Sequence, residues 1–139
     1  MAGRGRTGSG SVSPRARVLF MDDKEIVRAA VSEVLHELGY DVECAVEGAA
    51  ALELYRRARD AGMPFDVVVL DLTVAIGMGG REAIEKLLEV DPSAKIIVSS
   101  GYPNDPVIID YATYGASAVI IKPYNSSELD AVLEKVLHR

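Results

Sequence analysis

Three aspartates, a serine and a lysine stand where short apolar runs of this chain end. Asp22 and Asp23 follow one run, Asp71 follows a second, Ser100 closes a third, and Lys122 follows the last. Carboxylates held close together repel one another, and at least one would be protonated unless a cation compensates. Mg²⁺ is typically held by one or two carboxylates, with water and phosphate oxygens completing its octahedron. If these side chains converge, they predict a Mg²⁺ site suited to phosphate chemistry.

An aspartate beside such an ion has a specific use, because a carboxylate is a covalent acceptor for phosphoryl groups. The metal would neutralise charge on the transferring group and align it for in-line attack. Lys122 adds a positive charge able to pair with a phosphoryl oxygen, and Ser100 supplies a hydroxyl group. A single Asp after a strand is usually a turn or capping residue. Four such positions in the right order favour the functional interpretation.

Short apolar strands and amphipathic helices alternate along the chain and must position these residues. Strands are predicted over 18–21, 41–45, 67–70, 96–98 and 119–121. Helical spacing of apolar residues, with glycine or proline stops, predicts helices around 27–38, 51–58, 84–88 and 106–114. A last helix begins at Asn125, where Glu128 has the spacing of a capping box.

This alternation predicts an α/β fold: a doubly wound, five-stranded parallel sheet of flavodoxin-like (βα)5 type. The uniformly apolar run 67–70 fits a strand that is covered on both faces. In the strand order 2-1-3-4-5, strands one and three adjoin at the crevice where open sheets bind ligands. Asp22, Asp23 and Asp71 are therefore expected to converge there.

The composition is that of one globular domain. The chain has 139 residues, of which 49% are hydrophobic, enough for a single core.

No apolar run approaches the roughly 20 residues that span a bilayer, and no apolar stretch follows the N-terminal arginines as in a secretory signal. The single cysteine, Cys44, excludes an internal disulfide and indicates a reducing compartment. We therefore expect a cytoplasmic location without membrane contact.

Charge is unevenly distributed. All four charged residues in the first 17 positions are arginines; beyond them, 11 of the 15 basic residues remain beside 21 acidic ones, a balance of about −10. This acidity disfavours direct nucleic-acid binding. Residues 1–16, rich in Gly, Ser and Arg, are predicted to be a flexible linker or a tail left from cloning, and 17–139 the folded domain.

The chain resembles the response-regulator receiver family of two-component signalling from residue 17 to residue 137. The shared features are the acidic pair after strand one, the Asp after strand three, Ser-Gly after strand four and Lys-Pro after strand five. Four segments are most similar to receivers at the C-terminus of hybrid sensor histidine kinases: Leu70–Thr73, Gly77–Gly80, Ser99–Tyr102 and Lys122–Tyr124.

The resemblance implies that Asp71 is the phosphoacceptor and that Mg²⁺ is the cofactor. Asp23 would be a direct metal ligand and Asp22 a ligand largely through water. The backbone carbonyl of Thr73 would complete the protein's share of the coordination. The phosphodonor would be a histidine kinase or a histidine phosphotransfer protein. The domain is expected to be a signalling module, monomeric or weakly dimeric, that shifts a partner-binding face around strands four and five.

Further roles follow from the same resemblance. Ser100 would be the switch hydroxyl that moves to meet the phosphoryl group, and Lys122 would be its counter-charge. The Lys122–Pro123 bond is expected to be cis. Thr73 and Tyr102 occupy positions that tune attack of water on the aspartyl phosphate.

Three departures from the family pattern stand out. Val119 replaces an aromatic residue whose rotation reports phosphorylation in many receivers. Ala75-Ile76 replaces the usual Pro-Gly after the acceptor strand, and Lys24 replaces the common Glu after the acidic pair, which adds positive charge near the site. None of these changes removes the phosphorylation chemistry.

Two other functions stay open at this point. A phosphatase of the haloacid dehalogenase type also uses an Asp after a buried strand, but it needs a second Asp where this chain has Thr73. A receiver fold kept only as a scaffold would bind partners regardless of phosphorylation. No output domain is recognisable, so the chain is expected to be a stand-alone regulator or a piece of a hybrid kinase.

Several other residues are predicted to have no chemical role. His36 is expected on a solvated helix face, and His138 lacks any supporting kinase motif. The Gly77–Gly80 run lacks the Lys-Ser/Thr of a phosphate-binding P-loop and is predicted to be a flexible loop. Cys44 is expected to pack in the core, and Tyr111 and Tyr114 to pack on a helix or form a partner surface.

Overall fold

The computed structural model describes residues 13–138, and within them five strands alternate with five helices. The strands are β1 (Arg17–Met21), β2 (Asp41–Ala45), β3 (Val67–Asp71), β4 (Ile96–Ser100) and β5 (Ala118–Ile121). The helices are α1 (Glu25–Glu37), α2 (Gly48–Asp60), α3 (Gly80–Val90), α4 (Pro106–Ile109) and α5 (Ser126–Leu137).

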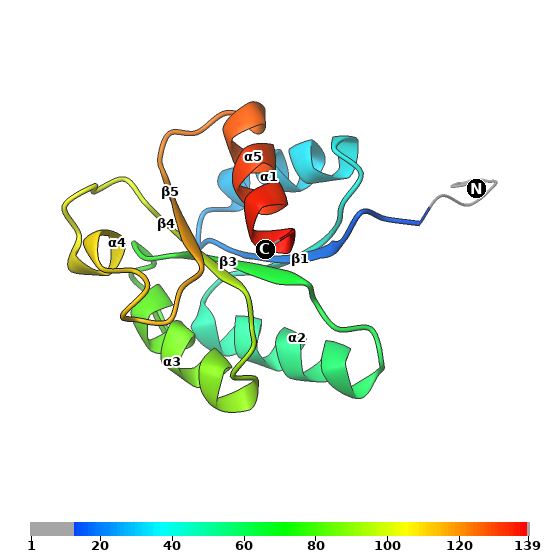
Figure 1. Cartoon of the computed structure of the whole chain (residues 1–139), viewed down its shortest axis with the longest axis horizontal. Coiled ribbons are helices and arrows are strands. Elements are labelled where there is room, and N and C mark those ends of the chain that lie inside the picture. The colour runs from blue at the N-terminus through cyan, green and yellow to red at the C-terminus, as the bar shows by residue number, and fades with distance from the viewer. Residues whose placement is uncertain (1–12, 139) are drawn as a thin grey trace.

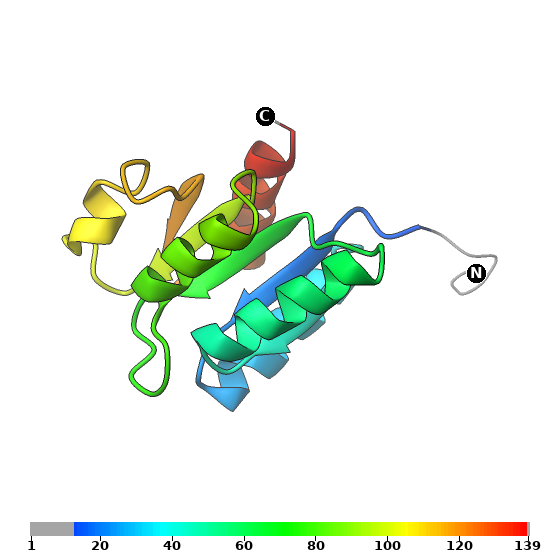
Figure 2. The same cartoon turned by 90° about the horizontal axis from the view of Figure 1, so that it is seen from below.

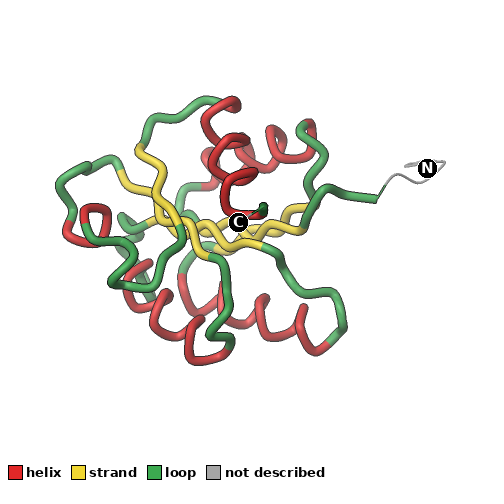
Figure 3. Tube along the Cα trace, in the orientation of Figure 1, coloured by secondary structure: helices red, strands yellow, loops and turns green. Residues whose placement is uncertain are grey.

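All strand pairs are parallel, and the sheet order is β2-β1-β3-β4-β5. The sheet lies between two layers of helices (Figures 1 and 3), with α1 and α5 on one face and α2 and α3 on the other. Figure 2 shows α2 and α3 side by side across their face. The predicted doubly wound fold and its strand order are therefore confirmed.

Each face of the sheet has its own apolar core. Alternate residues of β1 divide between the two faces: Leu19 packs toward α2 and α3, whereas Val18 and Phe20 pack toward α1 and α5. β3 is buried along its whole length, as its uniformly apolar sequence predicted. The largest fully buried side chains of the helices include Leu87 and Leu133. Burying such a leucine stabilises the fold by roughly 1.5–3 kcal/mol.

The strand register sets which residues meet at the carboxyl edge. Met21 pairs with Leu70, so Asp22 follows β1 beside the last residue of β3, Asp71. Asp71 in turn pairs with Ser99 of β4. Lys122 follows β5 immediately and donates its backbone N–H to the carbonyl of Ser100, at 2.9 Å. One edge of the sheet therefore carries Asp22, Asp71, Ser100 and Lys122.

The helix predicted over 106–114 is wrong in extent, because α4 ends at Ile109. Asp110 leaves the helical conformation, with φ −122° and ψ 41°. Its carboxylate accepts a hydrogen bond from the Thr113 hydroxyl at 2.9 Å, while its carbonyl accepts from the Thr113 N–H at 3.1 Å. Such local side-chain bonds compete with helix continuation. Turns therefore replace the helix, and Tyr111 and Tyr114 pack against the core from these turns.

The last helix begins as predicted, since the side chain of Asn125 accepts from the Glu128 N–H and Glu128 caps in return. Most of the predicted tail, residues 1–12, lies outside the described residues. Arg15 and Ala16 are described and belong to the packed domain: Arg15 donates its backbone N–H to the Gly39 carbonyl at 2.9 Å, and Ala16 is buried. No helix within residues 13–138 is long and apolar enough to cross a bilayer.

Candidate functional site

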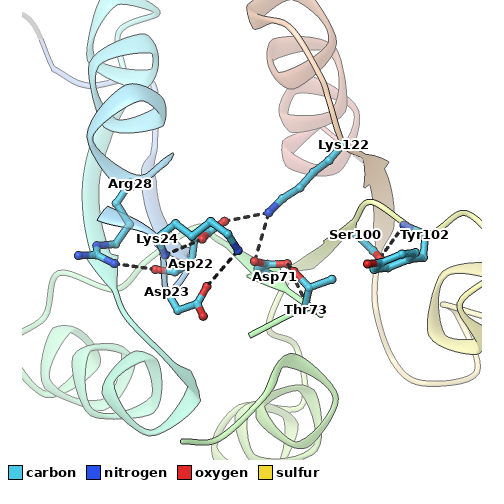
Figure 4. Close-up of polar contacts among 9 residues, drawn as sticks. All are labelled: Asp22, Asp23, Lys24, Arg28, Asp71, Thr73, Ser100, Tyr102 and Lys122. Atoms are coloured by element: carbon cyan, nitrogen blue, oxygen red, sulfur yellow. Dashed lines mark hydrogen bonds and ion pairs between the residues drawn. The ribbon is translucent and has the colours of Figure 1, made fainter. Parts of the chain in front are cut away.

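Three carboxylates gather at the carboxyl edge between β1 and β3. Each of Asp22, Asp23 and Asp71 offers an oxygen, and these oxygens lie within 4.8 Å of one another. Asp22 and Asp71 are fully buried, and the Asp23 side chain is 17% exposed. Figure 4 shows the three side chains facing a common space, with Lys122 reaching them from β5. The predicted convergence is therefore confirmed.

Lys122 joins two of these carboxylates. Its Nζ lies 2.9 Å from Asp22 Oδ2 and 3.2 Å from Asp71 Oδ2. Burial alone would lower the pKa of Lys122, but its bonds to Asp22 and its attraction to Asp71 outweigh this and raise the pKa above the ordinary value. Lys122 therefore carries a full positive charge at the acidic edge. The Lys122–Pro123 bond is cis, as the family resemblance implied.

Asp71 receives further hydrogen bonds from its own loop. Its Oδ1 accepts from the Thr73 N–H at 3.0 Å and from the Thr73 hydroxyl at 2.7 Å. Burial alone would raise the pKa of Asp71, but these two bonds and the charge of Lys122 outweigh it and hold the pKa below the ordinary value. Asp71 is therefore an ionised carboxylate inside a largely apolar fold, which is the state a nucleophile requires.

The donor set fits a hard divalent cation. Asp23 Oδ1 is buried and accepts no hydrogen bond from any residue in the described part of the chain. The Nζ of Lys24 lies 3.7 Å from this oxygen. A buried carboxylate oxygen without a donor is costly unless a cation approaches it. An oxygen-only set of this kind is what Mg²⁺ prefers.

Ser100 lies at the same edge but apart from the carboxylates. It is fully buried at the end of β4, and its Oγ accepts a hydrogen bond from the Tyr102 N–H at 3.0 Å. Among the described residues, no hydrogen bond joins Ser100 to Asp71. Figure 4 marks the contact between Ser100 and Tyr102, and no dashed line joins either residue to Asp71. The structure therefore gathers the carboxylates, Thr73 and Lys122 but leaves Ser100 outside their network.

Two residues near the site were not singled out from the sequence. Arg28 in α1 donates from Nη1 to the backbone carbonyl of Asp22 at 2.9 Å. Glu47 precedes α2, and its carboxylate caps that helix by accepting from Ala49 and Ala50 at 2.9 and 3.0 Å. The position of Glu47 just before a predicted helix could have indicated a capping role, although Glu is not among the preferred N-cap residues.

Glu47 also ties the loop after β3 to the start of α2. Its Oε1 accepts from the Met78 N–H at 2.9 Å, and the Gly48 N–H donates to the Met78 carbonyl. Gly77 has φ +68°, and a Cβ on it would lie 2.7 Å from Glu47 Oε1. The backbone bonds from Ala49 and Met78 hold the pKa of Glu47 below its ordinary value. The Gly77–Gly80 run was predicted to be a flexible loop, but these hydrogen bonds to Glu47 and Gly48 hold it in place, and its last residue, Gly80, begins α3.

The structure gives the positions of the residues that were expected to lack a chemical role. His36 is exposed on α1. Cys44 is half-buried in β2 and packs at the edge of the core that α1 and α5 cover. Val119, which replaces the aromatic residue of many receivers, packs half-buried against the other core.

Comparisons with known proteins agree with this geometry. The profile of the response regulator receiver domain matches residues 18–134. The chemotaxis protein CheY of Thermotoga maritima is 33% identical over 121 residues, which cover 86% of this chain and 96% of that protein. The structure of CheY4 from Vibrio cholerae superposes with a TM-score of 0.79 at 29% identity, covering 88% of this chain and 98% of that one.

A third similar structure is the receiver domain of the sensor histidine kinase PA1611 from Pseudomonas aeruginosa. It has a TM-score of 0.78 at 18% identity and covers 89% of this chain and 98% of that one. That crystal structure contains a magnesium ion coordinated in the active-site cleft. At this identity the likeness is one of fold. The profile match, the CheY similarity and the acidic edge together show that this chain belongs to the response regulator receiver domain family, the CheY-like signalling modules of two-component systems.

Proposed function

We propose that Asp71 accepts a phosphoryl group from the phosphohistidine of a histidine kinase or a histidine phosphotransfer protein. Receiver domains in general are phosphorylated on an aspartate with Mg²⁺. The observation that carries the assignment to Asp71 is its ionised, buried carboxylate, which faces two more carboxylates and lies 3.2 Å from Lys122 Nζ. Asp22 and Asp23 are the auxiliary acids in this proposal.

Mg²⁺ would be held by Asp23, Asp71 and the carbonyl of Thr73, with Asp22 bound largely through water. When bound, the ion neutralises charge on the phosphoryl group and orients it for in-line transfer. The support for this ligand set is the donor-free Oδ1 of Asp23 beside the two buried carboxylates. Thr73 Oγ and N–H both donate to Asp71 Oδ1 and hold that carboxylate in place.

The transfer itself is a displacement at phosphorus. A carboxylate oxygen of Asp71 forms the new P–O bond while the P–N bond of the phosphohistidine breaks, and its electron pair leaves with the imidazole nitrogen. Lys122 remains charged because its pKa is raised, and it is close enough to Asp71 to pair with a phosphoryl oxygen. This pairing is the counter-charge role proposed for it.

Ser100 is the proposed switch hydroxyl. It now accepts from the Tyr102 N–H, and its own O–H remains available to donate to a phosphoryl group on Asp71 once the side chain moves toward it. The loop between β4 and α4 would follow that movement. Val119 gives no aromatic side chain to rotate in response, so the proposed switch relies on Ser100 and its loop.

A phosphatase function lacks support from the site. The residue two positions after Asp71 is Thr73, whose hydroxyl donates to Asp71 itself and cannot serve as a carboxylate acid and base. Receivers are signalling modules, and no other catalytic chemistry is proposed for this chain.

Intact-mass measurement after incubation with acetyl phosphate and Mg²⁺ tests the proposal. We expect one phosphoryl adduct that EDTA prevents and that Asp71→Asn abolishes. Asp60→Asn, which changes an exposed aspartate at the end of α2, is the matched control and should still form the adduct. An adduct that persists in Asp71→Asn would defeat the assignment of the acceptor.

Origin in a hybrid histidine kinase, a cytoplasmic location and a monomeric or weakly dimeric state are further parts of the proposal. They rest on the sequence resemblance and the single cysteine. Sedimentation of the phosphorylated and unphosphorylated chain tests the oligomeric state. Transfer from purified histidine phosphotransfer proteins, compared with transfer from kinases, tests the class of donor.

A further inference from the structure

Three cations lie near the acidic edge among the described residues: Lys122 and Arg28 are held there by hydrogen bonds, whereas Lys24 makes only a longer ion pair. Its Nζ lies 3.7 Å from Asp23 Oδ1, the carboxylate oxygen that accepts no hydrogen bond in the described part of the chain. Its backbone is fixed, because the Lys24 N–H donates to Asp22 Oδ1 at 2.9 Å. The side chain is 60% exposed, so it can leave Asp23 without unpacking the fold.

Lys24 places its ammonium group beside Asp23, where a bound metal ion would otherwise supply the positive charge (Figure 4). Lys122 and Arg28, which donates to the backbone carbonyl of Asp22, offset two of the three carboxylate charges and leave one negative charge. Lys24 offsets this last charge, so the edge is neutral before any metal binds. A divalent ion therefore enters a neutral edge beside an ammonium group, whereas without Lys24 it would enter an edge with one negative charge.

We propose that Lys24 is a tethered counter-ion that competes with Mg²⁺ for Asp23 and thereby sets the affinity of the site for the metal. This inference rests on the metal site of the proposed function. Mg²⁺ binding must break the Lys24–Asp23 ion pair and move the ammonium group toward solvent. Lys24 is then a residue that determines the Mg²⁺ concentration at which this receiver becomes competent for phosphorylation.

The expected size of the effect is moderate. An exposed ion pair contributes up to about a fivefold factor in an equilibrium constant. Repulsion between the ion and a nearby ammonium group in water adds a factor of similar order. Replacing Lys24 with an uncharged residue should therefore tighten Mg²⁺ binding about three- to tenfold.

NMR-detected titration of the metal-free full chain with Mg²⁺ at low ionic strength measures this affinity without reference to phosphorylation. Lys24→Met removes the charge, keeps the apolar length of the side chain and adds no oxygen ligand. Lys24→Arg keeps the charge. Lys135→Met is the matched control, because Lys135 is exposed in the last turn of α5, at the opposite end of the domain from the site.

Lys24→Met should bind Mg²⁺ about three- to tenfold more tightly than the wild type, whereas Lys24→Arg and Lys135→Met stay near the wild-type value. The ratio between Lys24→Met and wild type should shrink at about 0.5 M salt, since exposed charges are screened there. The rise in Tm on adding Mg²⁺ should be larger for Lys24→Met. A wild-type affinity in Lys24→Met, or equal tightening in Lys135→Met, overturns the inference.

The Mg²⁺ titration distinguishes failure of this inference from failure of the proposed function. If the wild type and Lys24→Met bind Mg²⁺ equally, Lys24 is no competitor but the metal site stands. If neither binds Mg²⁺ at concentrations up to tens of millimolar, both the inference and the metal site are overturned.

Discussion

At the scale of single residues, the Asp71 carboxylate stays ionised because hydrogen-bond donors surround it and not because it is exposed to water. Burial without partners would keep a carboxyl group protonated. The Thr73 hydroxyl, the Thr73 N–H and the Lys122 ammonium group supply three donors and keep it ionised. Each donor can be removed separately, which makes the electrostatics of the site testable.

Thr73→Val removes the 2.7 Å hydroxyl bond to Asp71 Oδ1 and leaves the backbone bond in place. Because that bond favours the charged carboxylate, we expect the pKa of Asp71 to rise in the metal-free variant. Carbon-detected NMR titration of the carboxyl groups measures it. Thr113→Val, which removes a similar bond to Asp110 far from the site, should leave the pKa of Asp71 unchanged. An unchanged Asp71 in Thr73→Val would contradict the role given to that hydroxyl.

Lys122→Met leaves Asp22 and Asp71 buried without their shared cation. Removing one partner of a buried ion pair is strongly destabilising, so we expect the metal-free free energy of unfolding to fall by about 2–4 kcal/mol. Mg²⁺ should restore part of the loss, because it supplies the missing positive charge. Urea denaturation with EDTA and with Mg²⁺ measures both values, and Lys86→Met on α3 serves as the control. Equal losses in the two conditions would show that Lys122 acts through packing alone.

At the scale of elements, the loop after β3 is held by a contact with the start of α2, which lies about 30 residues earlier in the sequence. Glu47 accepts from residues on both sides, Ala49 in its own helix and Met78 in the loop after β3. Gly77 provides the room and the positive φ that this contact requires. The loop that carries Thr73 is therefore anchored at its far end by α2.

Gly77→Ala tests this anchor against a matched glycine. Gly62 also has a positive φ, +75°, but a Cβ there would meet nothing within 4 Å. Gly62→Ala should therefore cost only the backbone strain of about 1–2 kcal/mol. Gly77→Ala should cost about 1–2 kcal/mol more, because the new methyl group displaces Glu47 from its three N–H donors. Thermal or chemical denaturation gives both values.

A double variant checks the cause of the extra loss. When Glu47→Ala is already present, adding Gly77→Ala should cost no more than Gly62→Ala does. If the extra loss persists without the Glu47 side chain, the clash lies elsewhere in the loop.

At the scale of the whole molecule, a polar bond links two helices over the core that α2 and α3 cover. The Tyr55 hydroxyl in α2 donates to Asp91 Oδ2, just after α3, at 2.7 Å. This bond is the largest reason why the pKa of Asp91 lies below its ordinary value, and the bonds from Ser93 add to it. Burial is the main reason why the pKa of Tyr55 is raised.

Acid should weaken the hydrogen bond between Tyr55 and Asp91, because it protonates the Asp91 carboxylate. A carboxyl group whose pKa is lower in the folded state contributes stability that is present above its unfolded pKa, about 4, and is lost as the pH falls through the folded value. Tyr55→Phe should therefore cost about 1 kcal/mol at pH 7 and less near pH 3. Urea denaturation at the two pH values measures this. A loss that does not depend on pH would assign the effect of Tyr55 to packing.

Local sequence was sufficient to predict the order of the strands and helices and the location of the site, although not the extent of α4. Apolar runs and helical spacing depend on neighbours a few positions away, so β3 and the start of α5 at Asn125 could be predicted. The positions of Asp22, Asp71 and Lys122 after strands followed from the same pattern. Once the strand order is set, a parallel sheet must bring these strand ends to one edge.

Only the tertiary structure decided which atoms meet at that edge. Hydrogen bonds depend on tenths of an ångström and on rotamers chosen by packing, which no spacing along the chain encodes. The bond of Ser100 to Tyr102, the donor-free Oδ1 of Asp23 and the tie between Glu47 and Met78 therefore could not be predicted. At the end of α4, Asp110 leaves the helical conformation and accepts a bond from the Thr113 hydroxyl, and the spacing of apolar residues did not indicate this. The sequence alone thus determined that acids and a lysine share one edge, and packing determined which of their atoms are paired and which remain open to a cation.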